Sequence, residues 1–275
     1  MKSFLLLITL LFSGAVFAQD TCREYDEIIV YLDNESVIET NQIKEYLKYD
    51  FSQLCMYNDY PYGIIGEHYQ RLRIKFLKIE KSKEKPDEYL VYGKTKVKNK
   101  VRDFSGKIII EKIQEITIPN VDIHFLRDSI YPQFPYYNMK VQCLLTAKYE
   151  FYEDKRQKNA GIFSGELKSK FFINRNDSVR YDNWGASDWY HNNTFVGTWK
   201  KYNSNVSKIC NWGDYRVPST NCDFDNGDGE FGPAKKYLKY GWRTVEKCYN
   251  CPPNDNFEQD YHCRACKKER EKWWK

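Results

Sequence analysis

The spacing of hydrophobic and polar positions changes along the chain. Near the N-terminus, apolar residues recur at helical spacing and predict one amphipathic helix, carried by Ile43, Tyr46, Leu47, Phe51 and Leu54. From Tyr69 onward the period becomes two, and Leu72, Ile74 and Phe76 alternate with basic residues. Alternation of this kind is typical of a half-buried β-strand.

The alternating pattern continues through most of the chain. A short strand is expected at residues 27–32, before the helix. Further strands are expected at residues 89–98, 107–118, 140–152, 163–173, 178–181 and 194–202, the last taken as the final long strand. Residues 140–152 give the clearest alternation, with Cys143 as a small thiol on the apolar face. The pattern predicts a mainly β fold, an antiparallel barrel or sandwich-like sheet with one N-terminal helix and a small Cys-rich C-terminal tail. A strongly curved sheet wrapped on the helix is the alternative.

A Phe-x-Gly tripeptide occurs three times among the predicted strands, at residues 104–106, 163–165 and 195–197. A glycine inside a strand permits a bend, or lets an aromatic ring lie against bare backbone. We expect these three strands to enter one sheet through similar corners.

The first residues have the composition of an export signal. A basic residue, Lys2, precedes an apolar run of residues 4–12, and Val16-Phe17-Ala18 resembles a signal-peptidase site. The apolar run is shorter than the roughly 20 residues needed to span a bilayer. The expected organisation is a signal peptide at 1–18, a strand–helix segment at 19–66, an antiparallel β domain at 67–245 and a Cys-rich tail at 246–275, in a secreted or periplasmic protein with no transmembrane segment.

Composition limits the function classes. The net charge of +5 is mild, and the lysines alternate with acids, which favours a solvated surface over a nucleic-acid groove. Aromatic residues make up 17% of the chain, including 23 tyrosines and 7 tryptophans. Packing within a β-sheet explains most of these rings, and a face that binds a glycan or peptide is the other interpretation.

The C-terminal third carries a recognisable series of motifs. Phe195-x-Gly197-x-Trp199 is followed by Cys210-Asn-Trp-Gly-Asp-Tyr-Arg216, then by Gly-Asp-Gly-Glu-Phe at 227–231 and Gly-Trp at 241–242. This series resembles a set of exported bacterial β-rich proteins of unassigned function. The resemblance implies export and a β-rich fold, and it implies no activity.

Aromatic and charged residues at 211–216 suggest a ligand-binding loop. A ring to stack on a ligand and a charged group to bind its polar edge lie close together in sequence. The candidate ligand-binding residues are Trp199, Trp212, Tyr215 and Arg216. The competing interpretation is that Trp212 fills the end of the sheet and Arg216 pairs with Asp214.

A glycine-rich acidic stretch follows. Alternate acids on such a loop are what Ca²⁺ needs, although the match to a calcium-binding loop is imperfect and a polar surface turn is the competing interpretation. The candidate calcium ligands are Asp223, Asp225, Asp228 and Glu230.

The chain has nine cysteines, and four of them form two Cys-x-x-Cys pairs in the tail. Four thiolates at this spacing can bind a structural Zn²⁺ ion, whereas an oxidising compartment would favour disulfides. We therefore predict zinc or disulfides at Cys248, Cys251, Cys263 and Cys266. Cys22 with Cys55, and Cys210 with Cys222, are plausible further disulfides.

The sequence lacks the common motifs of hydrolases, metalloproteases and phosphate-binding loops. The favoured function is a non-catalytic binding or structural protein of the cell envelope, whose partner is an unknown envelope protein or glycan. The alternative is a secreted hydrolase acting on glycans through carboxylates at 214–230, for which two carboxyl groups must face one cleft.

Overall fold

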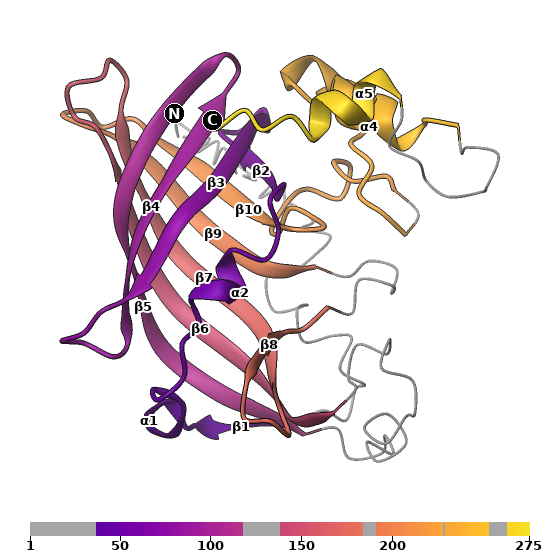
Figure 1. The fold of residues 1–275 in the computed structure, drawn as a ribbon. Coiled ribbons are helices and arrows are strands. Elements are labelled where there is room, and N and C mark those ends of the chain that lie inside the picture. The colour runs from indigo at the N-terminus through magenta and orange to yellow at the C-terminus, as the bar shows by residue number, and fades with distance from the viewer. Residues whose placement is uncertain (1–36, 118–137, 184–190, 228, 253–262) are drawn as a thin grey trace, which may run out of the picture.

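The computed structural model describes residues 37–117, 138–183, 191–227, 229–252 and 263–275. It contains one antiparallel sheet of ten strands, which curves into a ring-like arrangement (Figure 1). The strands are β1 (Val37–Asn41), β2 (Tyr62–Ile65), β3 (Gln70–Lys81), β4 (Glu88–Val97), β5 (Lys100–Thr117), β6 (Met139–Glu153), β7 (Gly161–Asn174), β8 (Val179–Tyr181), β9 (Asn192–Lys201) and β10 (Ser207–Asp214). The predicted mainly β, antiparallel fold class is confirmed.

The hydrogen-bonded order of the strands explains the ring. The order is β1-β5-β4-β3-β2-β10-β9-β7-β6, and a further pairing joins β6 to β5. The long strand β5 therefore pairs with β1, β4 and β6 along its length. The turns β2–β3, β4–β5, β6–β7 and β9–β10 all lie at one end of the ring, which we call the upper end (Figure 1).

The helices are short. They are α1 (Ile43–Tyr46), α2 (Ser52–Cys55), the 3₁₀ helix η2 (Lys235–Tyr240), α4 (Arg243–Tyr249) and α5 (Arg264–Glu269). The predicted amphipathic helix is thus two single turns, and the chain breaks between them where Asp50 accepts a hydrogen bond from the backbone N–H of Ser52 (2.9 Å). Tyr46, Phe51 and Leu54 are nonetheless buried against the sheet, as the apolar spacing predicted.

Aromatic side chains fill the interior of the ring. Trp212 stacks on Phe195 with ring centroids 4.6 Å apart and an interplanar angle of 14°. Tyr149 and Phe151 from β6 contact the same tryptophan. Each such buried aromatic side chain contributes roughly 1.5–3 kcal/mol through its removal from water.

The glycines of the Phe-x-Gly tripeptides allow this packing. Gly165 on β7 pairs directly with Gly197 on β9. A Cβ at Gly197 would lie 2.1 Å from the carbonyl oxygen of Ser164 and 2.6 Å from the hydroxyl of Tyr149. Bare backbone is therefore required where the Tyr149 side chain lies over Gly165 and Gly197, which confirms the expected role for these two glycines. At Gly106 an added Cβ would instead meet the backbone of Glu150 on β6.

The structure differs from the sequence-based strands in the C-terminal third. β10 follows β9, so residues 194–202 do not form the last long strand. Asn211, Trp212 and Asp214, predicted on a loop, lie on this strand and pair with β2 and β9. A strand predicted at 27–32 lies outside the described residues. No helix among the described residues is both long and apolar enough to cross a membrane.

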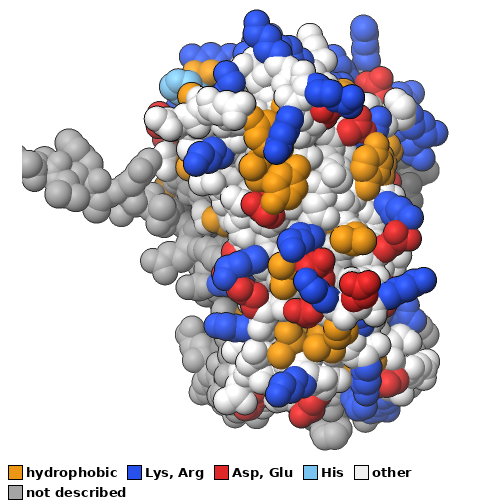
Figure 2. Space-filling model, turned by 90° about the vertical axis from the view of Figure 1, so that its left-hand side faces the viewer, with side chains coloured by type: hydrophobic (Ala, Val, Ile, Leu, Met, Phe, Trp, Pro, Cys, Tyr) orange, Lys and Arg blue, Asp and Glu red, His pale blue; other side chains and the backbone are white. Residues whose placement is uncertain are grey.

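The C-terminal helices pack outside the ring, beside the upper part of β3 (Figure 1). Glu269 of α5 binds both Arg71 and Arg73 of β3. Trp274 packs on Tyr60 with ring centroids 5.6 Å apart. The outer face of the sheet shows Lys and Arg interspersed with Asp and Glu (Figure 2), which agrees with the solvated surface inferred from the charge pattern.

Candidate functional site

The structure separates the four predicted ligand-binding residues. Trp212 is 1% exposed and Arg216 is 2% exposed, so neither side chain is open to a ligand. Tyr215 is half-buried, and its hydroxyl donates to Asn183 Oδ1 (3.0 Å). Of the four, only Trp199 lines a cavity that opens at the upper end of the ring and is described below. The fold therefore supports the other interpretation of Trp212, in which its ring packs inside the sheet rather than against a ligand.

Arg216 forms a different ion pair from the one considered in the sequence. Its guanidinium pairs with Asp225 and donates to the carbonyl oxygen of Gly229. Asp214 instead lies within the sheet and accepts hydrogen bonds from Tyr181 (2.8 Å) and Asn193 (2.7 Å). Burial raises the pKa of Asp214 to about 7, against the opposing effect of these hydrogen bonds.

The described acids of the predicted calcium loop engage other partners. Asp225 accepts the backbone N–H groups of Gly227 (3.1 Å) and Gly232 (3.0 Å) in addition to its pair with Arg216. Asp223 binds Lys236 and the hydroxyl of Tyr237. Glu230 lines a different cavity, beside the tail. These contacts favour the surface-turn interpretation, while a calcium site that includes Asp228 stays a prediction because that residue lies outside the described ones.

The hydrolase alternative also needs two carboxyl groups facing one cleft. Asp214 is 3% exposed inside the sheet, whereas Asp223 and Asp225 are held in the separate ion pairs described above. Asp214, Asp223 and Asp225 are therefore each bound to different partners, which does not favour a shared catalytic role.

A cavity of about 950 Å³ opens at the upper end of the ring. Its lining comes from the turns β2–β3 and β4–β5 and from β7, β9 and β10, and it includes Phe163, Trp199 and Ile65 as apolar surface. Lys100, Arg102 and Lys208 supply positive charge from β5 and β10.

Strand alternation explains why charged side chains point into this opening. Arg102 lies two residues before the buried Phe104, and Glu153 two residues after the buried Phe151. Residues two apart on a strand share a face, so both charges continue the inner, apolar face of their strands. The inner face thus changes from aromatic to charged as it approaches the opening.

A buried carboxylate organises the floor of the cavity. Glu153 accepts hydrogen bonds from Trp199 Nε1 (3.0 Å), the backbone N–H of Gly161 (2.9 Å) and Thr95 Oγ1 (3.3 Å). Arg102 Nε lies 4.0 Å from Glu153 Oε1. Burial raises the pKa of Glu153, and the contacts with Trp199 and Arg102 oppose that rise.

Arg102 retains hydrogen-bonding capacity at this floor. Its Nη2 donates to the carbonyl oxygen of Lys158 (2.9 Å), but its buried Nε–H has no hydrogen-bond acceptor among the described residues. A buried donor without an acceptor costs free energy, and a ligand acceptor would remove that cost. Nearby, Lys208 Nζ lies 5.8 Å from the centroid of the Trp199 ring.

The tail cysteines lie together at α4 and α5, with Cys248 on α4, Cys266 on α5, Cys251 just after α4 and Cys263 just before α5. Cys248 and Cys266 form a disulfide with their Cα atoms 4.7 Å apart. Cys251 and Cys263 are thiols, and the sulfur atoms of Cys251, Cys263 and Cys266 lie within 4.8 Å of one another, so this group could hold a metal ion. A hydrogen bond with Cys251 lowers the pKa of the Cys263 thiol.

The other expected disulfides are wrong. Cys55 and Cys210 are free thiols, so neither pairs with the cysteine proposed for it. Cys210 points from β10 into the core and is fully buried, whereas Cys222 lies in the loop beyond that strand and is disulfide-bonded. Cys143 is a fully buried free thiol, as its position on the apolar face predicted.

Sequence reasoning missed Arg102 and Glu153. The signal was present, since each stands at the end of an alternating apolar face where another hydrophobic residue would be expected. Comparison with protein-family models, with curated proteins and with solved structures finds no match to this chain.

Proposed function

We propose that this chain is an exported, non-catalytic binding protein whose ligand enters the cavity at the upper end of the ring. The observation that carries the proposal is the floor of that cavity, where Arg102 Nε–H has no hydrogen-bond acceptor in the described part of the chain and lies next to the Glu153–Trp199 hydrogen bond. A volume of about 950 Å³ lies within the range of small-molecule sites.

The charge of the lining selects the ligand. The cavity is lined by four cations, Lys98, Lys100, Arg102 and Lys208, and by two acids, Glu67 and Glu153. Glu153 already accepts hydrogen bonds from its own donors, so the cations outnumber the remaining acid. Phe163 and Ile65 add apolar surface. The ligand is therefore a small amphipathic molecule whose anionic group binds Arg102 while its apolar part packs on the wall.

An anionic aromatic probe, 8-anilinonaphthalene-1-sulfonate, tests this proposal by fluorescence titration. The Arg102→Gln variant should bind the probe roughly 10- to 100-fold more weakly, the range expected for a hydrogen bond to a charged group. Lys208→Gln, an exposed change, should also weaken binding. Arg156→Gln is the matched control, because this side chain is 90% exposed at the same end and does not line the cavity. Equal affinities for Arg102→Gln and Arg156→Gln would refute the proposal.

Export is the second part of the proposal, and it rests on the apolar segment at 4–12 and the cleavage pattern at 16–18. Expression of the full chain in a bacterium with fractionation tests it. Mature protein in the periplasm or medium should begin at Gln19, and uncleaved protein in the cytoplasm would contradict it.

For the tail, we infer that the cysteines stabilise the α4–α5 pair by the Cys248–Cys266 disulfide when oxidised and by a zinc ion when reduced. Four thiolates are needed for a closed structural zinc site, so reduction of the Cys248–Cys266 disulfide must precede metal binding. Native mass spectrometry of the reduced protein with one equivalent of zinc should show a single bound ion that EDTA removes. A reduced protein that takes up no zinc would exclude the metal-bound form.

A further inference from the structure

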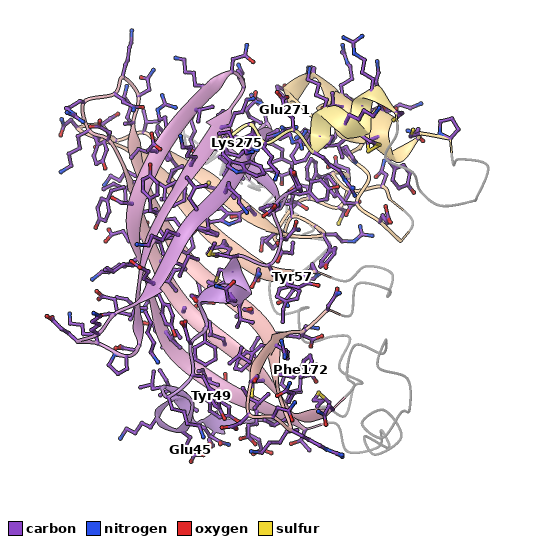
Figure 3. All side chains as sticks on the ribbon, in the orientation of Figure 1. Glu45, Tyr49, Tyr57, Phe172, Glu271 and Lys275 are labelled. Atoms are coloured by element: carbon purple, nitrogen blue, oxygen red, sulfur yellow. A yellow bond between two sulfur atoms is a disulfide. The ribbon has the colours of Figure 1, made fainter. Side chains whose placement is uncertain are left out.

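A second cavity lies outside the ring, between strands β3 and β4 and the C-terminal helices. Its volume is about 400 Å³. Its walls include Arg71 and Arg73 from β3, Lys96 from β4 and Lys98 from the turn after β4. The C-terminal region contributes Lys239, Arg243 and Lys268. Glu271, labelled in Figure 3 near the upper end, is the acidic residue of the lining. We call this cavity the basic groove.

Part of this positive charge is neutralised by the fold itself. Glu269 accepts hydrogen bonds from Arg71 Nη1 (2.8 Å) and Arg73 Nη2 (2.9 Å). Its pKa is lowered, because these two guanidinium groups outweigh the effect of burial. The pKa of Arg73 is lowered by burial and then by the adjacent charge of Arg71, which is the repulsion that Glu269 relieves.

The remaining five cationic side chains of the basic groove face one carboxylate, that of Glu271. In the part of the chain that the structure describes, Lys96, Lys98, Lys239, Arg243 and Lys268 have no carboxylate oxygen within 4.0 Å. The positive charges around this depression add up to a positive electrostatic potential, which attracts anions to the basic groove. Gln70, Asn99 and Thr244 place further polar groups on the same walls.

We propose that the basic groove binds a ligand carrying at least two phosphate or sulfate groups. Cations stand on opposite walls of the basic groove, so a ligand with several negative charges can pair with both walls at once. A ligand with a single carboxylate can pair with one wall only. Arginine and lysine are the usual binders of such oxyanions. The basic groove adjoins the cavity at the upper end of the ring and shares Gln70, Lys98 and Asn99 with it. Arg243 and Lys268 line only the basic groove, so they distinguish the two sites.

Two probes distinguish a phosphate ligand from a sulfate ligand. Inorganic pyrophosphate represents a free phosphate compound, and a sulfated disaccharide represents a sulfated sugar. Isothermal titration of the full chain at low salt should show one site for at least one of them, with an affinity that falls as salt is added.

Matched variants locate the site. Arg243→Gln and Lys268→Gln should each weaken binding about tenfold. Lys247→Gln on α4 and Lys267→Gln on α5 remove the same charge from exposed positions outside the lining and should change affinity less than about threefold. The Arg102→Gln variant should bind these probes normally, so failure of the upper cavity and failure of the basic groove can be told apart.

Two results would overturn the proposal. One is the absence of binding for both probes at low salt. The other is an equal loss of affinity in the Lys247 and Lys267 variants, which would mean that general surface charge rather than the basic groove attracts the anion.

Discussion

The buried carboxyl group of Asp214 should make the stability of this protein depend on pH. Asp214 is 3% exposed at the end of β10, and its Oδ2 accepts hydrogen bonds from Tyr181 and Asn193. The Asp214→Asn variant keeps an oxygen that can accept both hydrogen bonds and removes the ability to ionise. The comparison therefore isolates the cost of a buried negative charge.

The magnitude follows from the pKa. Burial raises the pKa of Asp214 from 3.8 to about 7, and each unit corresponds to 1.36 kcal/mol, so the change amounts to about 4 kcal/mol. Because the folded-state pKa lies above that of the unfolded chain, the folded state binds the proton more tightly. The stabilisation is complete below about pH 4 and is lost as the pH rises through 7.

Urea unfolding of both proteins between pH 4 and pH 8 measures this effect. The free energy of unfolding of Asp214→Asn, relative to the parent chain, should increase by about 4 kcal/mol from pH 4 to pH 8. Other titrating groups, including Glu153, are common to both proteins and cancel in the difference. Parallel curves for the two proteins would show that Asp214 is ionised without penalty, and the reasoning would fail.

Three further predictions concern the core, the tail and the thiols. Gly197→Ala should lower the free energy of unfolding by about 2–4 kcal/mol in urea titrations, because the new Cβ meets the Tyr149 hydroxyl and a β7 carbonyl; an unchanged midpoint would contradict this packing. Glu269→Gln should destabilise the docked tail by about 3 kcal/mol, since two guanidinium groups lose their counter-charge, and faster proteolysis of the C-terminal helices would report it. Iodoacetamide should leave Cys143 and Cys210 unmodified in the native protein, because both thiols are fully buried and burial raises the pKa of each. Mass spectrometry of the labelled peptides measures this, and early modification of either cysteine would contradict the burial.

The sequence predicted the strands with the clearest alternation and also the short strand β8, but it missed β1, β2 and β10. Residues 140–152 and 163–173 correspond closely to β6 and β7, since one face of each strand packs in the aromatic core. β1 and β2 have only five and four residues, too few for alternation to be distinguished from chance. β10 was interpreted as a loop because its Asn, Gly and Asp are residues typical of turns.

The site was predicted less well than the fold, for a physical reason. Trp212 and Arg216 have side chains typical of a binding loop. Whether these side chains are buried depends on the segments that flank them, and those segments are distant in sequence. Trp212 is buried because β10 pairs with β2 on one side and β9 on the other. The cation–carboxylate floor of the cavity likewise joins Arg102 on β5 to Glu153 on β6, and local patterns carry no information about that pairing.

The pairing of β2 with β10 has a consequence for synthesis of the chain. Ile64 is paired with Asn211, so one hydrogen-bonded seam of the ring joins segments separated by most of the described sequence. Until β10 leaves the ribosome, β2 and β9 both present unpaired backbone edges, which are the surfaces through which β proteins aggregate. Pairings so distant in sequence also form slowly. A chain truncated before residue 207 should consequently aggregate rather than fold into a smaller domain, because these two edges stay unpaired until β10 is made.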